Sequence, residues 1–73
     1  MVTQTVIFPK AYGARKARNW LRNHRLKFGK VDRKPKTIRF RQVDPSSCQR
    51  GSYATIDMGS TGIKKVICCP RQA

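Results

Sequence analysis

The clearest pattern along the chain is an alternation of hydrophobic and basic residues at positions 37–43. Ile38 and Phe40 fall on one side of an extended segment, and Arg39 and Arg41 fall on the other. Successive side chains of a strand point to opposite faces of a sheet. The pattern therefore predicts a strand with one buried face and one basic face, which the polar run at 44–47 ends.

Four further segments have the composition of strands. They are residues 3–8, 28–32, 52–58 and 63–69. Turn signals separate them, because Pro9 follows the first, Pro35 lies within the turn at 33–36, and the glycine-containing run 59–62 predicts a hairpin loop. The chain is therefore expected to contain five strands.

Residues 14–25 contain neither glycine nor proline and carry a stripe at helical spacing. The stripe consists of Ala14, Ala17, Trp20, Leu21 and His24. The element order β-α-β-β-β-β predicts an α+β fold, with one amphipathic helix on one face of a mainly antiparallel sheet. Seventy-three residues suffice for a single domain, 1–73. Its expected core is Trp20, Leu21, Ile38, Phe40 and Ile56.

Positive charge dominates the composition. Lysine and arginine number 17 against 3 acidic residues, all aspartate, and the formal net charge is +14. Thirteen of the basic residues lie between Lys10 and Arg41, where Asp32 is the one acid. Self-repulsion at this density destabilises a compact state, so a negatively charged partner is expected.

The helix concentrates this charge on one edge. At about 100° per residue, Arg15, Arg18, Arg22 and Arg25 fall within a sector of about 80° beside the apolar stripe. A helix face that serves only solubility normally mixes signs, because acid–base pairs at helical spacing stabilise it and like pairs destabilise it. Arginine also grips phosphate or carboxylate oxygens in pairs. A ligand-facing edge is favoured over a merely solvated one.

Arg39 and Arg41 form a second basic patch, with Tyr53 as an expected neighbour. The sequence leaves open whether the two patches face the same way. If they do not, the protein would bridge two partners or be wrapped by one.

Other chemistries fit the residues less well. Zinc sites need cysteine pairs on a turn, whereas Cys68 and Cys69 adjoin on a strand and point to opposite faces. His24 suits the C-terminus of the helix better than a metal site. A general acid–base pair would need His24 beside an aspartate, and no spacing favours one. We expect no enzyme activity, cofactor, metal, membrane contact or small-molecule substrate.

The three cysteines are an odd number, and no secretory signal precedes them. A disulfide between the adjacent Cys68 and Cys69 would be strained. Reduced thiols inside a virion or host cell, in the cytoplasm or nucleus, are the simpler interpretation, and secretion is not expected.

The chain contains a series of short motifs: Lys16-Ala17-Arg18-Asn19-Trp20-Leu21, Lys30-Val31-Asp32 and Arg39-Phe40-Arg41-Gln42, followed by Pro45, Gly51-Ser52-Tyr53, Thr55-Ile56-Asp57 and Gly62-Ile63-Lys64. In this order they resemble a small domain of bacteriophages and large DNA viruses of eukaryotes, which occurs alone or leads some phage prohead-protease polypeptides. The resemblance covers roughly residues 6–67 and implies a viral origin and virion association. This chain has Arg25 where that family usually has glycine, and its helix is more uniformly basic.

These observations predict a virus-encoded, non-enzymatic module that binds nucleic acid with low sequence specificity. The predicted contacts are Arg15, Arg18, Arg22, Arg25, Arg39 and Arg41. Trp20 is assigned to the core and not to base stacking. The alternative is a minor capsid or virion structural protein whose arginines dock on acidic faces of neighbouring capsid proteins.

Overall fold

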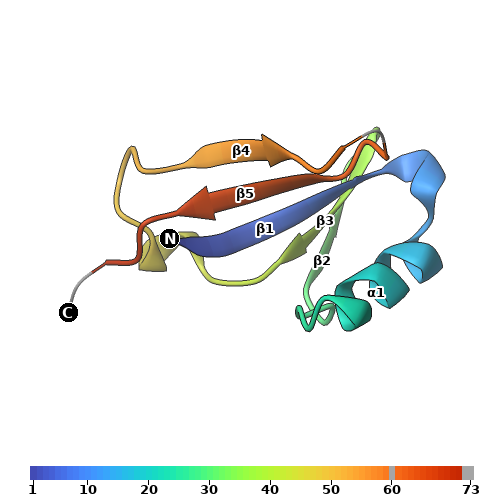
Figure 1. Ribbon diagram of the computed structural model, residues 1–73, viewed down its shortest axis with the longest axis horizontal. Coiled ribbons are helices and arrows are strands. Elements are labelled where there is room, and N and C mark those ends of the chain that lie inside the picture. Colours follow the sequence, from blue (N-terminus) through green and yellow to red (C-terminus); the bar gives the residue numbers. More distant parts are fainter. Residues whose placement is uncertain (60, 72–73) are drawn as a thin grey trace.

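The computed structural model describes residues 1–59 and 61–71, and it confirms the α+β class (Figure 1). The elements are β1 (Val2–Pro9), η1 (Lys10–Tyr12), α1 (Ala14–Asn23), β2 (Val31–Arg33), β3 (Thr37–Arg41), η2 (Pro45–Ser47), β4 (Ala54–Asp57) and β5 (Lys64–Cys68). The predicted order of one helix and five strands is therefore confirmed, and η1 and η2 are short 3-10 turns that the pattern did not predict.

The five strands form one sheet in the order β2-β3-β1-β5-β4, and each neighbouring pair is antiparallel. The eight-residue β1, rich in β-branched side chains, lies at the centre. Two hairpins flank it, β2–β3 closed by a hydrogen bond from the Lys34 N–H to the Thr37 carbonyl (2.9 Å), and β4–β5. Both predicted turns are confirmed, although Ser60 of the second lies outside the described residues.

Helix α1 covers one face of the sheet over β1 and β3 (Figure 1). The buried cluster between them consists of Val6, Phe8, Ala17, Leu21, Ile38, Phe40 and Ile63. Leu21, Ile38 and Phe40 were predicted correctly. Trp20 is half-buried at the border of this cluster, edge-on to Phe8 with ring centroids 5.6 Å apart.

The prediction that Ile56 belongs to the core is wrong, because its side chain is 40% exposed. Ile56 lies on the edge strand β4, two strands away from the centre of the sheet. A helix of ten residues is about 15 Å long and does not reach across the whole sheet. The alternation of apolar and polar residues therefore identified β4 correctly, but it did not show whether another element covers the apolar side chains of this strand.

The predicted boundaries also shift by one to three residues, and two of these shifts have a clear cause. The strand predicted at 28–32 is found at Val31–Arg33, which includes the first residue of the predicted turn, because β2 pairs only with Ile38–Phe40 of β3. The helix predicted to run to Arg25 ends at Asn23, where a capping motif reverses the chain.

That motif places Arg25 in the left-handed conformation with φ 57°, unlike any other non-glycine residue that the structure describes. The Leu26 N–H donates to the Leu21 carbonyl (2.8 Å) and the Arg25 N–H to the Arg22 carbonyl (3.1 Å). These two bonds define a Schellman motif, in which glycine normally takes the position of Arg25. Leu26 packs against the core beside Leu21, so tertiary packing holds a conformation that the arginine disfavours.

The expectation that all cysteines are reduced is wrong in the structure. Cys48 and Cys68 form a disulfide with a Cα–Cα distance of 5.6 Å, and both residues are buried. Cys69 is free and half-buried, and it lies just past the end of β5. The disulfide was missed because its partners are 20 positions apart, and their approach depends on the loop after β3 folding back onto β5.

Backbone contacts hold the same loop against the end of the chain. The Gln49 N–H donates to the Cys69 carbonyl and the Arg71 N–H to the Ser47 carbonyl, each at 2.8 Å. Cys48 and Pro70 form an isolated β-bridge between these two hydrogen bonds. The disulfide therefore lies inside a small folded corner and does not tether two loose segments.

Candidate nucleic-acid interface

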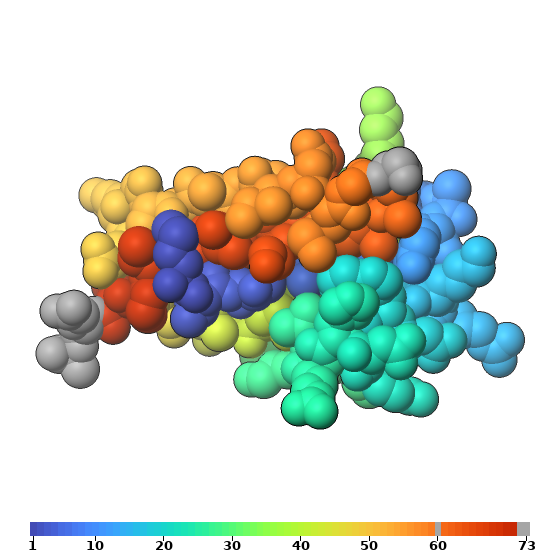
Figure 2. Space-filling view, viewed as in Figure 1, coloured from blue at the N-terminus to red at the C-terminus, as the bar shows by residue number. Residues whose placement is uncertain are grey.

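The arginines of α1 extend into solvent as the sequence predicts. Arg15, Arg18 and Arg22 are exposed, while Ala17 and Leu21 on the adjoining stripe are fully buried. Figure 2 shows α1 protruding at the lower right of the molecule, with its outer side free of other elements. Arg25 lies just past the helix end and is also exposed. We call these four residues the helix edge.

No acidic side chain neutralises the helix edge within the described residues. The ion pairs in the described part of the chain are Lys34–Asp32 at 3.4 Å and Arg41–Asp44 at 3.7 Å, and neither involves a residue of α1. The first turn of the helix contains no acidic residue, and Gly13 at its N-cap provides no side-chain cap. Like charges at helical spacing cost about 0.2–0.5 kcal/mol per pair. The helix thus depends on packing for its stability.

Arg22 makes a specific contact at the C-terminal end of the helix edge. Its guanidinium carbon lies 5.7 Å from the ring centroid of Phe28, within the range of a cation–π interaction. Phe28 follows the helix in the 24–30 loop and is 38% exposed. An aromatic ring therefore lies at the surface beside the basic edge.

Arg39 and Arg41 lie on the opposite face of the sheet from α1. They alternate with Ile38 and Phe40, which are buried under the helix, and both arginines are exposed. Their cross-strand neighbours on β1 are Ile7 and Thr5. The two predicted patches therefore do not face the same way, which answers the question that the sequence left open.

A hollow of about 510 Å³ lies where β3 ends. Its lining includes Lys27, Gly29, Lys30, Arg41, Gln42 and Asp44. We call it the linking hollow, because it joins the loop that follows α1 to Arg41 of the sheet patch. Three of its eight lining residues are basic, and the acidic one, Asp44, pairs with Arg41.

Gln42 fixes one wall of the linking hollow. The Lys27 N–H donates to Oε1 of Gln42, and Nε2 of Gln42 donates to the Lys27 carbonyl, both at 2.7 Å. Gln42 is buried, so both bonds are shielded in part from water. The side-chain amide of Gln42 therefore bonds both backbone groups of Lys27, as a neighbouring strand would, and holds the 27–30 loop against the end of β3.

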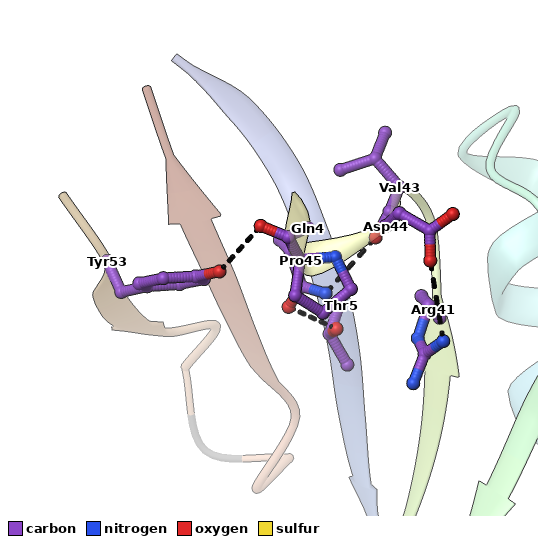
Figure 3. Close-up of polar contacts among 7 residues, drawn as sticks. All are labelled: Gln4, Thr5, Arg41, Val43, Asp44, Pro45 and Tyr53. Atoms are coloured by element: carbon purple, nitrogen blue, oxygen red, sulfur yellow. Dashed lines mark hydrogen bonds and ion pairs between the residues drawn. The ribbon is translucent and has the colours of Figure 1, made fainter. Parts of the chain in front are cut away.

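A smaller hollow of about 190 Å³ continues along the open face of the sheet. It is lined by Gln4, Thr5, Asp32, Arg39, Arg41 and Pro45. Arg41 thus borders both hollows. Tyr53, the expected neighbour of the sheet patch, instead donates from its hydroxyl to the Pro45 carbonyl at 3.2 Å (Figure 3). Tyr53 is 45% exposed, and its acceptor Pro45 lines this hollow.

Sequence reasoning missed Lys27, Phe28, Lys30 and Gln42. Two lysines that flank an aromatic residue and a glycine within 27–30 are a local signal that could have identified the first three. Gln42 had no such signal, because its role depends on a partner 15 positions away.

Trp20 and His24 occupy structural positions. Their rings stack at 3.8 Å between centroids, and Nδ1 of His24 lies 2.8 Å from the Trp20 carbonyl. The other edge of Trp20 meets Phe8. His24 thus closes the last turn of the helix, as its position in the sequence indicates.

Within residues 1–59 and 61–71, no three His, Cys, Asp or Glu side chains gather closely enough to hold a metal ion. None of the helices in this part of the chain has the length and apolar composition needed to traverse a bilayer. No protein-family model, curated protein or solved structure matches the chain.

Proposed function

We propose that this protein binds nucleic acid through its basic surface, with low sequence specificity and without catalysing a reaction. The contacts are Arg15, Arg18, Arg22, Arg25, Arg39 and Arg41. The observation that carries the proposal is the unpaired state of the helix edge: none of its arginines has an ion-pair partner among the described residues. The net charge of +14 adds an attraction for any polyanion.

Low specificity follows from the kind of contact. Guanidinium groups on an exposed helix edge reach phosphate oxygens, which position a protein on nucleic acid but carry no base sequence. From the motif resemblance described in the sequence analysis, we also propose that the protein is virus-encoded and acts in the virion or inside the host cell.

A salt titration tests the proposal. Affinity for duplex DNA, single-stranded RNA and polyglutamate is measured by fluorescence anisotropy between about 50 and 200 mM salt. If about six phosphates of a duplex are neutralised, the logarithm of affinity should fall against the logarithm of salt with a slope near −5. Equal affinity for polyglutamate would contradict the proposal, because it would show attraction to negative charge of any kind.

Charge reversal locates the surface. Replacing Arg18 and Arg22 with Glu should abolish binding, and circular dichroism should show that the fold remains. The control replaces Lys10 and Lys36 with Glu, which changes the net charge by the same amount. Both lysines are exposed at the far end of the β1–β3 pair. If the two double variants lose the same affinity, the helix edge is not the binding surface.

A second candidate is a virion structural protein that docks on acidic capsid faces. It is favoured by the exposed Ile56 on edge strand β4, where a partner strand could add to the sheet. Lys64 on the neighbouring β5 pairs in register with Asp57 of β4, and it adds positive charge beside this edge strand. Stoichiometric incorporation into capsids that lack nucleic acid would favour this candidate over the first.

A further inference from the structure

The two basic surfaces lie on opposite faces of one thin sheet. The domain measures 37 × 22 × 21 Å along its principal axes, and the sheet separates the helix edge from Arg39 and Arg41. One straight ligand therefore contacts one surface or the other. A ligand that contacts both has to turn around the end of the sheet.

The linking hollow lies where such a ligand would bend around the end of the sheet. It opens at the end of β3, with Lys27 and Lys30 on the loop side and Arg41 on the sheet side. A further hollow of about 330 Å³ is lined by Lys30, Val31, Asp32 and Arg41, so Lys30 and Arg41 flank two adjoining depressions. Positive side chains thus continue from one face of the sheet to the other.

Phe28 connects the linking hollow to the helix edge. In the chain it lies between Lys27 and Gly29, which both line the hollow, although its own ring is not part of that lining. Its ring centroid lies 5.7 Å from the guanidinium carbon of Arg22. An exposed aromatic ring flanked by basic groups is what single-stranded nucleic acid binds, because bases stack on the ring while phosphates meet the charges. Arg22, Phe28, Lys30, Arg41 and Arg39 therefore form one continuous path.

The geometry of this path selects between forms of nucleic acid. A DNA duplex has a persistence length of about 150 base pairs, so a sharp bend around a domain of this size is costly. A single strand bends freely, and its unpaired bases are available for stacking. A duplex could contact the helix edge or the sheet patch, but it could not follow the path.

We propose that the ligand is a single strand of nucleic acid, which passes from the sheet face through the linking hollow to the helix edge and stacks a base on Phe28. Gln42 is a positioning residue for this path, since it holds the Lys27 backbone in place. The inference rests on the proposed function and specifies the ligand and route of that same surface.

The first test compares forms of nucleic acid. Binding of a 20-nucleotide oligothymidylate and of a 20-base-pair duplex is measured by anisotropy at the same ionic strength. The single strand is expected to bind at least tenfold more tightly. Equal or tighter binding of the duplex overturns the inference but leaves the proposed function intact, whereas salt-independent or absent binding of both overturns the two together.

The second test separates stacking from charge. Phe28→Leu keeps an apolar side chain but removes the ring, and it should lower single-strand affinity about tenfold with an unchanged salt slope. Phe28→Tyr should retain wild-type affinity. Unchanged affinity in the leucine variant, with duplex binding also unchanged, would remove base stacking from the route.

Lysine replacements test the hollow itself. Replacing both Lys27 and Lys30 with Ala should reduce the magnitude of the single-strand salt slope by about 1.4, since each phosphate contact contributes about 0.7. The matched control replaces Lys10 and Lys36, which lie outside the linking hollow. An equal reduction in both variants would contradict passage through the hollow. Thermal unfolding of each variant shows whether the fold is retained.

Discussion

The side-chain amide of Gln42 pairs with the backbone of Lys27 through two hydrogen bonds of 2.7 Å. This contact joins the residue that follows β3 to the loop that follows α1, 15 positions earlier in the chain. It holds Lys27 at the hollow that Arg41 also lines, so that the loop after α1 and the end of β3 border the same hollow.

Replacing Gln42 with Leu should lower the free energy of unfolding by about 1–3 kcal/mol, because the partly buried N–H and carbonyl of Lys27 lose their partners. Denaturant unfolding measures this loss, and hydrogen exchange should show faster exchange of the Lys27 amide. Gln49→Leu is the control, since Gln49 donates one exposed side-chain bond to the Pro70 carbonyl. A loss no larger than the control's would mean that the amide pair does not stabilise the loop.

Replacing Arg25 with Gly should raise stability by about 0.5–1 kcal/mol. The residue has φ 57° in a Schellman motif, a conformation that costs a side-chain-bearing residue about 1–2 kcal/mol. The added freedom of glycine in the unfolded chain offsets part of that gain. Arg25→Ala removes the same charge but keeps the strain, so thermal unfolding should show stabilisation only for glycine. If both variants gain equally, charge relief and not backbone conformation is the cause.

Replacing Arg15 with Glu should stabilise the protein by about 0.5–1 kcal/mol while weakening nucleic-acid binding. A carboxylate in the first turn interacts favourably with the helix dipole, and Arg18 three positions later becomes an opposite charge. Lys16→Glu makes the same charge change on the other flank of the apolar stripe and should weaken binding less. Unfolding and anisotropy measurements on the same samples check both effects, and a loss of affinity no greater than that of Lys16→Glu would count against the helix edge.

Removing Asp44 should strengthen binding. Its carboxylate lies 3.7 Å from Arg41 at the rim of the linking hollow, and an exposed pair of this kind contributes about 0–1 kcal/mol to stability. Asp44→Asn is expected to raise single-strand affinity severalfold with little change in thermal stability. Asp57→Asn on β4 adds the same charge away from the hollow. Equal gains in the two variants would show that only net charge matters.

Reduction of the Cys48–Cys68 disulfide should cost about 3 kcal/mol of stability, since the bond closes a loop of 20 positions. Denaturant unfolding with and without a reductant measures the difference. Cys69→Ser should unfold like the wild type under oxidising conditions. A reduced protein as stable as the oxidised one would show that the Ser47–Arg71 and Gln49–Cys69 backbone contacts suffice to hold this corner.

The sequence by itself determined the number and order of the strands and the α-helix, because hydrophobic periodicity is a local property. The alternation around Phe40 identified both the buried face of β3 and the outward direction of Arg39 and Arg41. The spacing of Arg15, Arg18 and Arg22 identified an exposed helix edge in the same way.

Only the tertiary structure decided where these faces point and what covers them. Ile56 alternates as regularly as Phe40, yet α1 lies over the centre of the sheet and leaves β4 exposed. The disulfide of Cys48 and the amide pair of Gln42 likewise join residues that are distant in sequence. Such contacts arise when loops close over a shared core, and no pattern within a single segment specifies which distant residues they bring together.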